Sequence, residues 1–207
     1  MNDNNILAVV LAGGKSKRFG EDKNLAKLGN ITLLEHVLKK VTQKFKKTLI
    51  ISNQNLNIKK INSITIVPDC IQENLGPLVG VLTAMKWIKK NNEKYQWIAT
   101  FPCDTPFFDT SIVDEYKKKI NLNESSLYFV KSNEKRHNIF GLWSIKLIDT
   151  LEKDLLDNNY RKVEKWADKI GVKIINVKND KFDSFFNINT KTDLEEANKL
   201  LKEHKND

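Results

Sequence analysis

The chain has 207 residues, a length that suits one globular domain. Its composition, 40% hydrophobic and 29% charged, excludes a disordered or fibrous protein. The formal charge of +9 comes almost entirely from lysine and indicates a preference for anionic ligands. Because these lysines fall on polar faces of expected helices, a solvated surface accounts for most of them. A nucleic-acid groove, which would combine arginine with exposed aromatic residues, is not expected.

Cysteine usage and the apolar runs bear on the cellular compartment. Cys70 and Cys103 are far apart in the sequence and form no metal-binding spacing. The longest apolar runs fall well short of the roughly 20 residues that span a bilayer. The N-terminal MNDNN lacks the apolar core of a secretory signal. We therefore expect a cytoplasmic protein with reduced cysteines and no membrane segment.

Apolar strand-like runs alternate with amphipathic helix-like segments along the whole chain. Such alternation predicts an α/β layered fold with a mostly parallel central sheet. No linker, repeat or low-complexity segment interrupts it, so residues 1–207 are expected to form one domain. The expected strands are Ile6–Leu11, Thr48–Ser52, Ile64–Val67, Trp97–Phe101, Leu127–Lys131, Phe140–Trp143 and Val172–Val177, and the expected helices are Leu33–Phe45, Val79–Lys90, Ser111–Ile120, Ile145–Leu156, Val163–Ile170 and Asp193–Glu203.

One helix start is signalled by its capping residues. Thr192 is followed three positions later by Glu195, the spacing of a capping box, which predicts Thr192 as the N-cap of the last helix.

The turn-forming residues are concentrated in the first half of the chain. All four prolines and six of the eight glycines precede residue 107, and nearly all follow an expected strand. In an open parallel sheet, ligands bind beyond the carboxyl ends of the strands. The special backbone therefore lies where a ligand site is expected, although tight turns alone would also explain it.

The first expected strand leads directly into the loop LAGGKSKRFGEDK. Gly13 and Gly14 allow the backbone N–H groups to approach a phosphate closely. The loop matches neither a P-loop nor a GxGxxG fingerprint. Its cations repel one another unless a polyanion lies among them, so Lys15, Arg18 and Lys23 are candidate phosphate contacts.

A second candidate follows the strand around Trp97–Phe101. In TFPCDTPFF, Asp104 stands between two prolines that rigidify its turn. Magnesium binds to one or two carboxylates and completes its shell with phosphate oxygens, so Asp104 is a candidate metal ligand. An aspartate that merely caps a turn is the alternative.

Five further polar or small residues lie near strand ends or in the segments that follow them. Asp69 could accept the N1–H and N2–H₂ donors of guanine, and Asn53 could contact the base or ribose. Gly80 lies in the helix that follows NLGP, while Asn187 and Asn189 alternate with apolar residues before the last helix. Ordinary turn or sheet-edge roles explain each of these residues equally well.

The combination LAGG-x3-R-F-G-x-DK, NLGPLVG, PCDTP and NINT-x-x-DL, in this order, strongly resembles the molybdenum cofactor guanylyltransferase family, the MobA proteins. The match runs from about Ile6 to Leu194. These enzymes transfer GMP from GTP to molybdopterin-bound molybdenum. The resemblance implies a three-layer Rossmann-like nucleotidyltransferase fold, with GTP bound by the N-terminal half and molybdopterin by the C-terminal half.

The resemblance also implies roles for individual residues. Arg18, Lys23 and Asp104 would be catalytic, and Asp104 would hold Mg²⁺. Asn187 and Asn189 match residues on the pterin side. The nucleotide contacts implied by the match and by the loop chemistry are Leu11, Ala12, Gly13, Gly14, Lys15, Lys23, Asn53, Asp69, Gly80 and Asp104.

The expected partners are the two substrates, GTP and Mo-molybdopterin, with transient contacts to proteins that deliver molybdopterin or accept the finished cofactor. A monomer is expected, without nucleic acid or membrane. A nucleotidyltransferase that uses CTP or a different phosphorylated acceptor remains the alternative. The region 112–161 matches chiefly at Gly141–Trp143, so the acceptor contacts within it stay open.

Overall fold

A computed structural model describes residues 5–13, 19, 23–56, 58, 61–71, 75–178 and 183–203. The candidate loop residues Gly14, Lys15 and Arg18 lie outside the described residues, as does Gly20.

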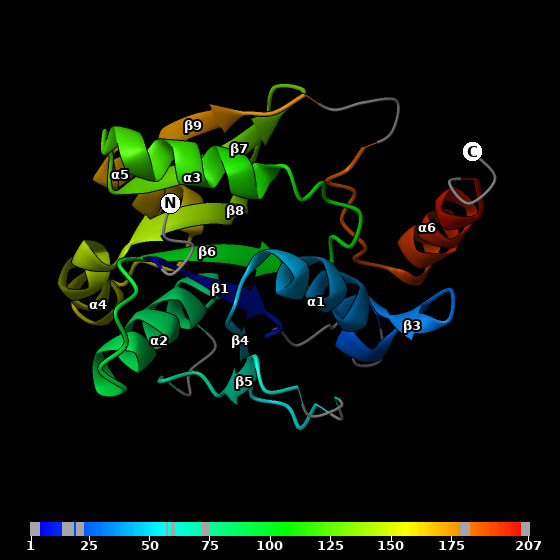
Figure 1. Ribbon diagram of the computed structural model, residues 1–207, viewed down its shortest axis with the longest axis horizontal. Coiled ribbons are helices and arrows are strands. Elements are labelled where there is room, and N and C mark those ends of the chain that lie inside the picture. The colour runs from blue at the N-terminus through cyan, green and yellow to red at the C-terminus, as the bar shows by residue number, and fades with distance from the viewer. Residues whose placement is uncertain are drawn as a thin grey trace.

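A seven-stranded sheet forms the middle of the molecule, in the order β5-β4-β1-β6-β8-β7-β9 (Figure 1). Four of its six strand pairs are parallel, and β8 alone runs against its neighbours. The mostly parallel sheet is therefore confirmed. The strands are β1 (Ile6–Leu11), β4 (Thr48–Ile51), β5 (Ile64–Val67), β6 (Trp97–Pro102), β7 (Leu127–Ser132), β8 (Lys135–Ser144) and β9 (Lys173–Asn176).

The apolar run of β1 is continuous because both of its faces are buried. Ala8 and Val10 belong to one hydrophobic cluster, whereas Leu7 and Val9 belong to a second cluster on the other face. A strand buried on both faces loses the apolar–polar alternation of a half-exposed strand. This places β1 in the middle layer of three.

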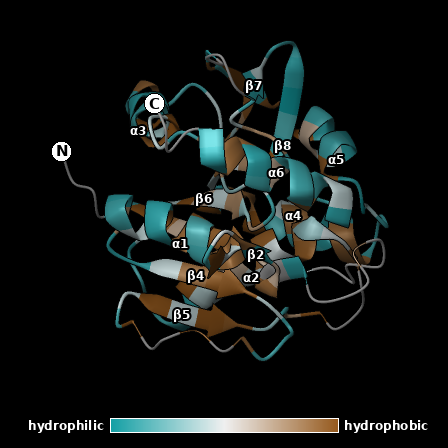
Figure 2. Cartoon of the chain, turned by 90° about the vertical axis from the view of Figure 1, so that its right-hand side faces the viewer, coloured by the Kyte–Doolittle hydropathy of each residue, from teal (hydrophilic) through white to brown (hydrophobic). Residues whose placement is uncertain are grey.

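Helices cover both faces of the sheet. The cluster on one face contains residues of α1 (Leu33–Lys44) and α3 (Ile112–Leu122). The cluster on the other face contains residues of α2 (Pro77–Lys90), α4 (Ile148–Leu156) and α5 (Val163–Ile170). Hydrophobic strands lie between helices with hydrophilic outer faces (Figure 2). No helix in the described part of the chain is both long and apolar enough to cross a bilayer.

The segment that was expected to form one helix over Ile145–Leu156 is divided. A 3₁₀ turn, η3 (Ile145–Leu147), precedes α4, and the Ser144 hydroxyl accepts from the backbone N–H of Lys146 at its start.

A third, smaller cluster was not anticipated from the sequence. It lies beside a two-stranded hairpin, β2 (Lys27–Leu28) and β3 (Ile31–Thr32), which follows the 3₁₀ turn η2 (Lys23–Leu25). The last helix, α6 (Lys191–Glu203), packs against this hairpin (Figure 1). The buried members of the cluster are Phe19, Leu28, Leu33, Ile188 and Ala197.

The predicted cap of α6 is wrong by two residues. Thr192 already lies inside the helix. The Thr190 hydroxyl accepts from the Asp193 N–H at 3.1 Å, and the Asp193 carboxylate accepts from the Thr190 N–H at 2.8 Å. Aspartate at the third position thus replaces the Glu or Gln that the usual capping box contains.

Strand β8 is longer than the expected Phe140–Trp143 and contains a bulge. Its pairing with β7 passes from Phe129–Gly141 to Val130–His137, so residues 138–140 have no counterpart on β7. Bulges of this kind redirect side chains and occur next to functional sites.

Candidate active site

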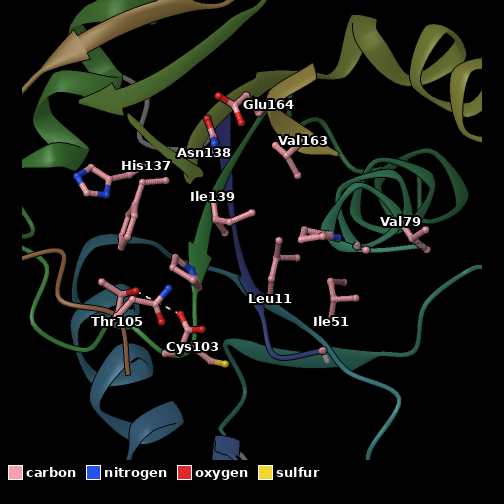
Figure 3. A pocket seen from close by; sticks show the side chains of 18 of the residues that line it. Leu11, Ile51, Val79, Cys103, Thr105, His137, Asn138, Ile139, Val163 and Glu164 are labelled. Atoms are coloured by element: carbon pink, nitrogen blue, oxygen red, sulfur yellow. Dashed lines mark hydrogen bonds between the residues drawn. The ribbon is translucent and has the colours of Figure 1, made fainter. Parts of the chain in front are cut away.

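A cleft of about 960 Å³ opens at the carboxyl ends of β1, β4 and β6. The chain passes from β1 to β4 and β5 on one side and then returns to β6 on the other. This reversal of strand order separates the connections and leaves a crevice, the usual ligand position in open α/β sheets. The lining comes from both halves of the chain (Figure 3).

Three of the predicted site residues meet at the carboxyl end of β6. The Lys23 ammonium donates to Asp104 Oδ2 at 2.7 Å and to Asn189 Oδ1 at 2.8 Å. The side chains of Lys23 and Asp104 are only 11% and 21% exposed, so this ion pair is largely removed from solvent. Asp104 and Asn189, each more than 80 positions from Lys23 in the sequence, therefore accept from the same ammonium group.

The Asp104 turn is held from several directions. Its backbone carbonyl accepts from the Ile188 N–H at 2.9 Å, and its Oδ1 accepts from the Thr105 hydroxyl at 3.2 Å. Further along, the Lys40 ammonium donates to the Phe108 carbonyl at 2.7 Å. Burial lowers the pKa of Lys40 to about 8, against the opposing effect of Asp109. The turn that carries Asp104 is thus fixed before a ligand arrives.

Asn53 and Asp69 form a reciprocal pair across the ends of β4 and β5. The Asn53 amide donates to Asp69 Oδ2 at 2.8 Å, and the Asp69 N–H donates to Asn53 Oδ1 at 2.8 Å. A Cβ placed on Gly13 would lie 4.0 Å from Asp69 Oδ2, so the glycine loop begins beside this carboxylate. Burial raises the pKa of Asp69, while the hydrogen bond from Asn53 acts in the opposite direction.

Gly80 has a clear packing reason. A Cβ at this position would lie 2.7 Å from Leu11 Cδ2 and 3.5 Å from Ile51 Cγ2, so only glycine lets α2 approach β1 and β4 this closely. Leu11 and Gly80 both line the cleft. Ala12 is buried, and its N–H donates to the Ile51 carbonyl at 3.0 Å.

The opposite wall comes from β8, the start of α5 and the C-terminal segment, and the sequence did not single out most of it. Figure 3 shows Asn138 and Ile139 of the bulge near Glu164 of α5, facing Leu11 and Ile51 across the cleft. The described lining of this wall comprises Lys135, Arg136, His137, Asn138, Ile139, Phe140, Arg161, Lys162, Val163, Glu164, Phe185 and Asn187.

Charge is unevenly distributed on this wall. Four cationic side chains line it, and two of them, Arg136 and Arg161, belong to a chain with only three arginines. The Arg136 guanidinium donates to Asn138 Oδ1 and to Asp168 Oδ1, both at 2.7 Å. These bonds hold its planar group at the edge of the cleft.

His137 is a neutral, aromatic part of the same wall. Its ring stacks on Phe185 with centroids 4.1 Å apart, and its Nε2 lies 2.8 Å from the Ser132 hydroxyl. Burial lowers the pKa of His137 to about 4; Lys135 adds to this effect and Asp183 opposes it. The imidazole is therefore uncharged at neutral pH.

A divalent cation fits the donor chemistry beside Asp104. Within the described ranges no group of three His, Cys, Asp or Glu residues could hold a metal by itself. A carboxylate that lines a cleft is nevertheless the kind of single ligand that Mg²⁺ accepts when phosphate oxygens and water complete its shell. A carboxylate oxygen keeps a further lone pair even when it accepts from Lys23 or Thr105.

Comparison with known proteins agrees with this architecture. Residues 8–170 match the family model of the MobA-like NTP transferase domain. The molybdenum cofactor guanylyltransferase of Rhizobium rhizogenes is 31% identical over 198 residues, which cover 93% of this chain and 90% of that protein. The chain belongs to the molybdenum cofactor guanylyltransferase family. It is therefore a nucleotidyltransferase, as the sequence predicted.

Solved structures show the same fold. Molybdopterin-guanine dinucleotide biosynthesis protein A from Archaeoglobus fulgidus has a TM-score of 0.75 and 22% identity, covering 95% of this chain and 99% of that one. The 4-diphosphocytidyl-2C-methyl-D-erythritolsynthase of Anaerococcus prevotii has a TM-score of 0.69 and 14% identity, covering 97% and 100%. Rv0371c of Mycobacterium tuberculosis, solved as a complex with manganese, has a TM-score of 0.65 and 14% identity, covering 95% and 98%. The fold therefore does not by itself distinguish the nucleotide.

In this member of the guanylyltransferase family, the structure brings most of the candidate residues to one cleft. Lys23, Asp104 and Asn189 share hydrogen bonds, and Asn53 pairs with Asp69. Asn187 lines the wall opposite Leu11. The two asparagines of NINT thus have different surroundings, although the sequence placed both on the pterin side.

The residues missed in this family member include the basic run Lys135–His137, which the sequence analysis did not single out. Its position at a strand bulge beside the cleft depends on tertiary pairing with β7 and β6.

Proposed function

We propose that the protein transfers GMP from GTP to molybdopterin-bound molybdenum, forming the guanine dinucleotide cofactor and releasing pyrophosphate. The observation that carries the proposal is the buried Lys23–Asp104 pair in a two-walled cleft, in a chain of this family. The cleft lies at the upper end of the range that single small-molecule sites occupy, which is consistent with two substrates.

The nucleotide belongs on the wall formed by β1, β4, β5 and α2. Asp69 supports this placement, because its carboxylate can accept both the N1–H and the N2–H₂ of guanine, a pair that cytosine lacks. Asn53 orients that carboxylate through the hydrogen bond it donates. With the base there, the phosphates run past Gly13 toward Lys23. Lys15, Arg18 and Gly14 remain sequence-based candidates for the same phosphates.

The metal proposed for this site is Mg²⁺, held by Asp104 together with phosphate oxygens. When bound, it would neutralise charge on the phosphates and so lower the electrostatic barrier to the transfer. Lys23 would also neutralise charge on the phosphates, because its ammonium lies 2.7 Å from Asp104 and its buried charge favours a polyanion nearby.

The acceptor belongs on the opposite wall. Its anionic groups suit the cationic edge around Arg136, Arg161 and Lys162, and a flat heteroaromatic ring suits the stacked pair His137–Phe185. With the two substrates on facing walls, the terminal phosphate of the acceptor approaches the α-phosphorus of GTP near Asp104.

The reaction needs no protein nucleophile. The acceptor phosphate is already anionic; one of its oxygens forms a bond to the α-phosphorus while the bond from that phosphorus to the bridging oxygen of pyrophosphate breaks. The leaving pyrophosphate carries the negative charge away. The main task of the protein is to bring two anions together and stabilise the developing charge, which Lys23 and the loop amides would do.

Turnover with GTP and with CTP, with Mo-molybdopterin supplied, tests the proposal. We expect GTP to be used at least tenfold more efficiently, and release of pyrophosphate in equal amount to the dinucleotide cofactor formed. We also expect Asp104→Ala to lower kcat by about 10²–10³-fold, because one preorganised electrostatic contact has that typical value. Loss of the carboxylate also leaves the Lys23 ammonium without its counter-ion, so the melting temperature is expected to fall, and activity is compared at a temperature where the variant is folded.

Equal or better use of CTP would replace guanylyl transfer by the alternative, a related nucleotidyltransferase with another nucleotide or acceptor. Near-normal activity of Asp104→Ala would remove Asp104 from the proposed metal site. A Thr105→Val variant serves as a control for the Asp104 loop, since it removes one hydrogen bond to the carboxylate and keeps the carboxylate itself.

A further inference from the structure

The segment that follows β9 enters the nucleotide side of the site. The family match ends at residue 170, whereas Asn189 lies well beyond it and contacts Lys23, a residue of the first loop. We propose that Asn189 is a positioning residue for the Lys23 ammonium, so that this C-terminal segment completes the site for the phosphates of GTP. The inference rests on the proposed function for the identity of that ligand.

Two side chains accept hydrogen bonds from the Lys23 ammonium. Asn189 Oδ1 accepts from Lys23 Nζ at 2.8 Å, and Asp104 Oδ2 accepts from the same nitrogen at 2.7 Å. An ammonium has three donors on a flexible stem and loses much rotamer freedom when it is held in place. Two acceptors define the direction of the ammonium much better than Asp104 alone.

Asn189 is itself rigidly held. The Asp193 carboxylate accepts from the Asn189 N–H at 2.7 Å and from the Thr190 N–H at 2.8 Å. On the other side, the Ile188 N–H donates to the Asp104 carbonyl at 2.9 Å, and the Ile188 side chain is buried in the small cluster beneath α6. The segment is therefore attached both to α6 and to the Asp104 turn.

The charge of Asp193 interacts favourably with the charge of Lys23. Burial alone would raise the pKa of Asp193, but the hydrogen bonds from Asn189 and Thr190 and the nearby Lys23 charge lower its pKa overall. Asp193 therefore stays ionised at neutral pH, and its negative charge lies on the same side of the site as the Lys23 ammonium. The side-chain amide of Asn189 and the carboxylate of Asp193, which caps α6, thus both stabilise the buried ammonium of Lys23.

A direct contact between Asn189 and the acceptor is the competing explanation, and the two differ in one measurable respect. If Asn189 positions Lys23, its loss weakens GTP binding even when no acceptor is present. If Asn189 contacts the acceptor, GTP binding alone is unaffected and only the KM for the acceptor rises.

The experiment measures binding of GTP with Mg²⁺ by calorimetry, without acceptor, to the wild-type chain, Asn189→Ala, Lys23→Met and the double variant. We expect Asn189→Ala to raise the Kd by about tenfold, the size of effect associated with a hydrogen bond to a charged group. The double variant is expected to bind GTP no more weakly than Lys23→Met, because the effect of Asn189 passes through Lys23.

Asn198→Ala, in α6, is the matched control. The Asn198 side chain accepts from the Gly29 N–H at 2.9 Å and so helps α6 to dock on the hairpin. It is expected to lower the melting temperature slightly and leave GTP binding unchanged.

Three results would overturn the inference. The first is that Asn189→Ala binds GTP as tightly as the wild type does. The second is that the effects of Asn189→Ala and Lys23→Met on GTP binding are additive. The third is that Asn198→Ala weakens GTP binding as much as Asn189→Ala does, which would make docking of α6 the cause. Failure of the proposed function is recognised separately, because the wild-type chain itself would then bind no GTP.

Discussion

At the residue scale, the pair formed by Asn53 and Asp69 shows how one carboxylate is prepared for a base. The two reciprocal hydrogen bonds fix the side chain of each residue against the backbone or side chain of the other. Burial raises the pKa of Asp69, which is the cost of keeping a carboxylate at the inner end of a cleft. The pair is useful only if a ligand supplies further donors to that carboxylate.

Asp69→Asn tests this role. An amide offers one acceptor and one donor group, so it cannot accept two hydrogen bonds from guanine with a single planar edge. We expect the preference for GTP over CTP to fall by roughly tenfold to a hundredfold, since a bidentate contact with a base is worth about 1–3 kcal/mol. The measurement is the ratio of kcat/KM for the two nucleotides. An unchanged ratio would place base recognition elsewhere in the cleft.

At the scale of elements, one threonine holds β8 against β6. Thr100 Oγ1 accepts from the Trp143 indole N–H at 2.9 Å and from the Gly141 N–H at 3.2 Å, and it donates to the Ile139 carbonyl at 2.6 Å. Gly141 itself has no space for a side chain, since a Cβ would lie 2.4 Å from Trp143 Nε1. This contact fixes β8 where its bulge turns toward the cleft.

Thr100→Val should be strongly destabilising although it keeps the volume of the side chain. The indole and backbone donors would lose their acceptor in a buried position, and each such loss costs about 1–3 kcal/mol. We expect the free energy of unfolding, measured with denaturant, to fall by about 2–4 kcal/mol in total.

Thr48→Val is the matched control in β4. Thr48 is fully buried, and its hydroxyl has no hydrogen-bond partner among the described residues. Replacing it with valine removes an unsatisfied polar group, so the free energy of unfolding is expected to stay the same or to rise. Equal losses in both variants would show that the hydroxyl of Thr100 is not what anchors β8.

At the scale of the whole molecule, His137 connects three parts of the chain. It belongs to β8, bonds to Ser132 of β7 and stacks on Phe185 of the C-terminal segment. Charging this imidazole would place a cation in a partly desolvated position beside Lys135. The fold therefore favours its neutral form.

Stability should consequently depend on pH. Burial first of all, and then Lys135, lower the pKa of His137 from 6.5 to about 4 in the folded state. Between these two values the unfolded chain binds more protons than the folded chain, so the free energy of unfolding falls as the pH is lowered from about 6.5 to about 4.

The His137→Gln variant removes this contribution, and its unfolding free energy should vary less over the same interval. We expect a difference of about 1 kcal/mol, since partial exposure of the imidazole screens the full effect of the shift. His36→Gln, in α1, is the control for loss of a histidine elsewhere. Identical pH profiles for the wild type and His137→Gln would refute the assignment.

Much of the fold could be predicted because it depends on local patterns. Each of the seven strands of the central sheet was expected, since apolar runs bounded by turn residues are recognisable in isolation. The hairpin β2–β3 was missed because two-residue strands carry no periodicity. The division before α4 and the shifted cap of α6 were missed because several nearby residues could serve as the cap.

The candidate site was predictable where chemistry is concentrated in a short motif. Gly13 and Asp104 closely follow the strands β1 and β6, Lys23 belongs to the same loop motif as Gly13, and parallel strands bring their carboxyl ends to one edge. The wall formed by β8 and α5 was not predictable, because the bulge over residues 138–140 appears only when β8 pairs with two different neighbours.

The amino-acid sequence by itself determined the family, the layered architecture and the motifs that meet at the sheet edge, because each depends on residues close together in the chain. Only the tertiary structure decided which groups distant in the sequence accept hydrogen bonds from the same donor or line the same wall of the cleft. The packing of α6 and the order of the strands bring Asp104 and Asn189 to the ammonium group of Lys23. Hydrogen bonds act over about 3 Å in space, whatever the separation of the residues along the chain.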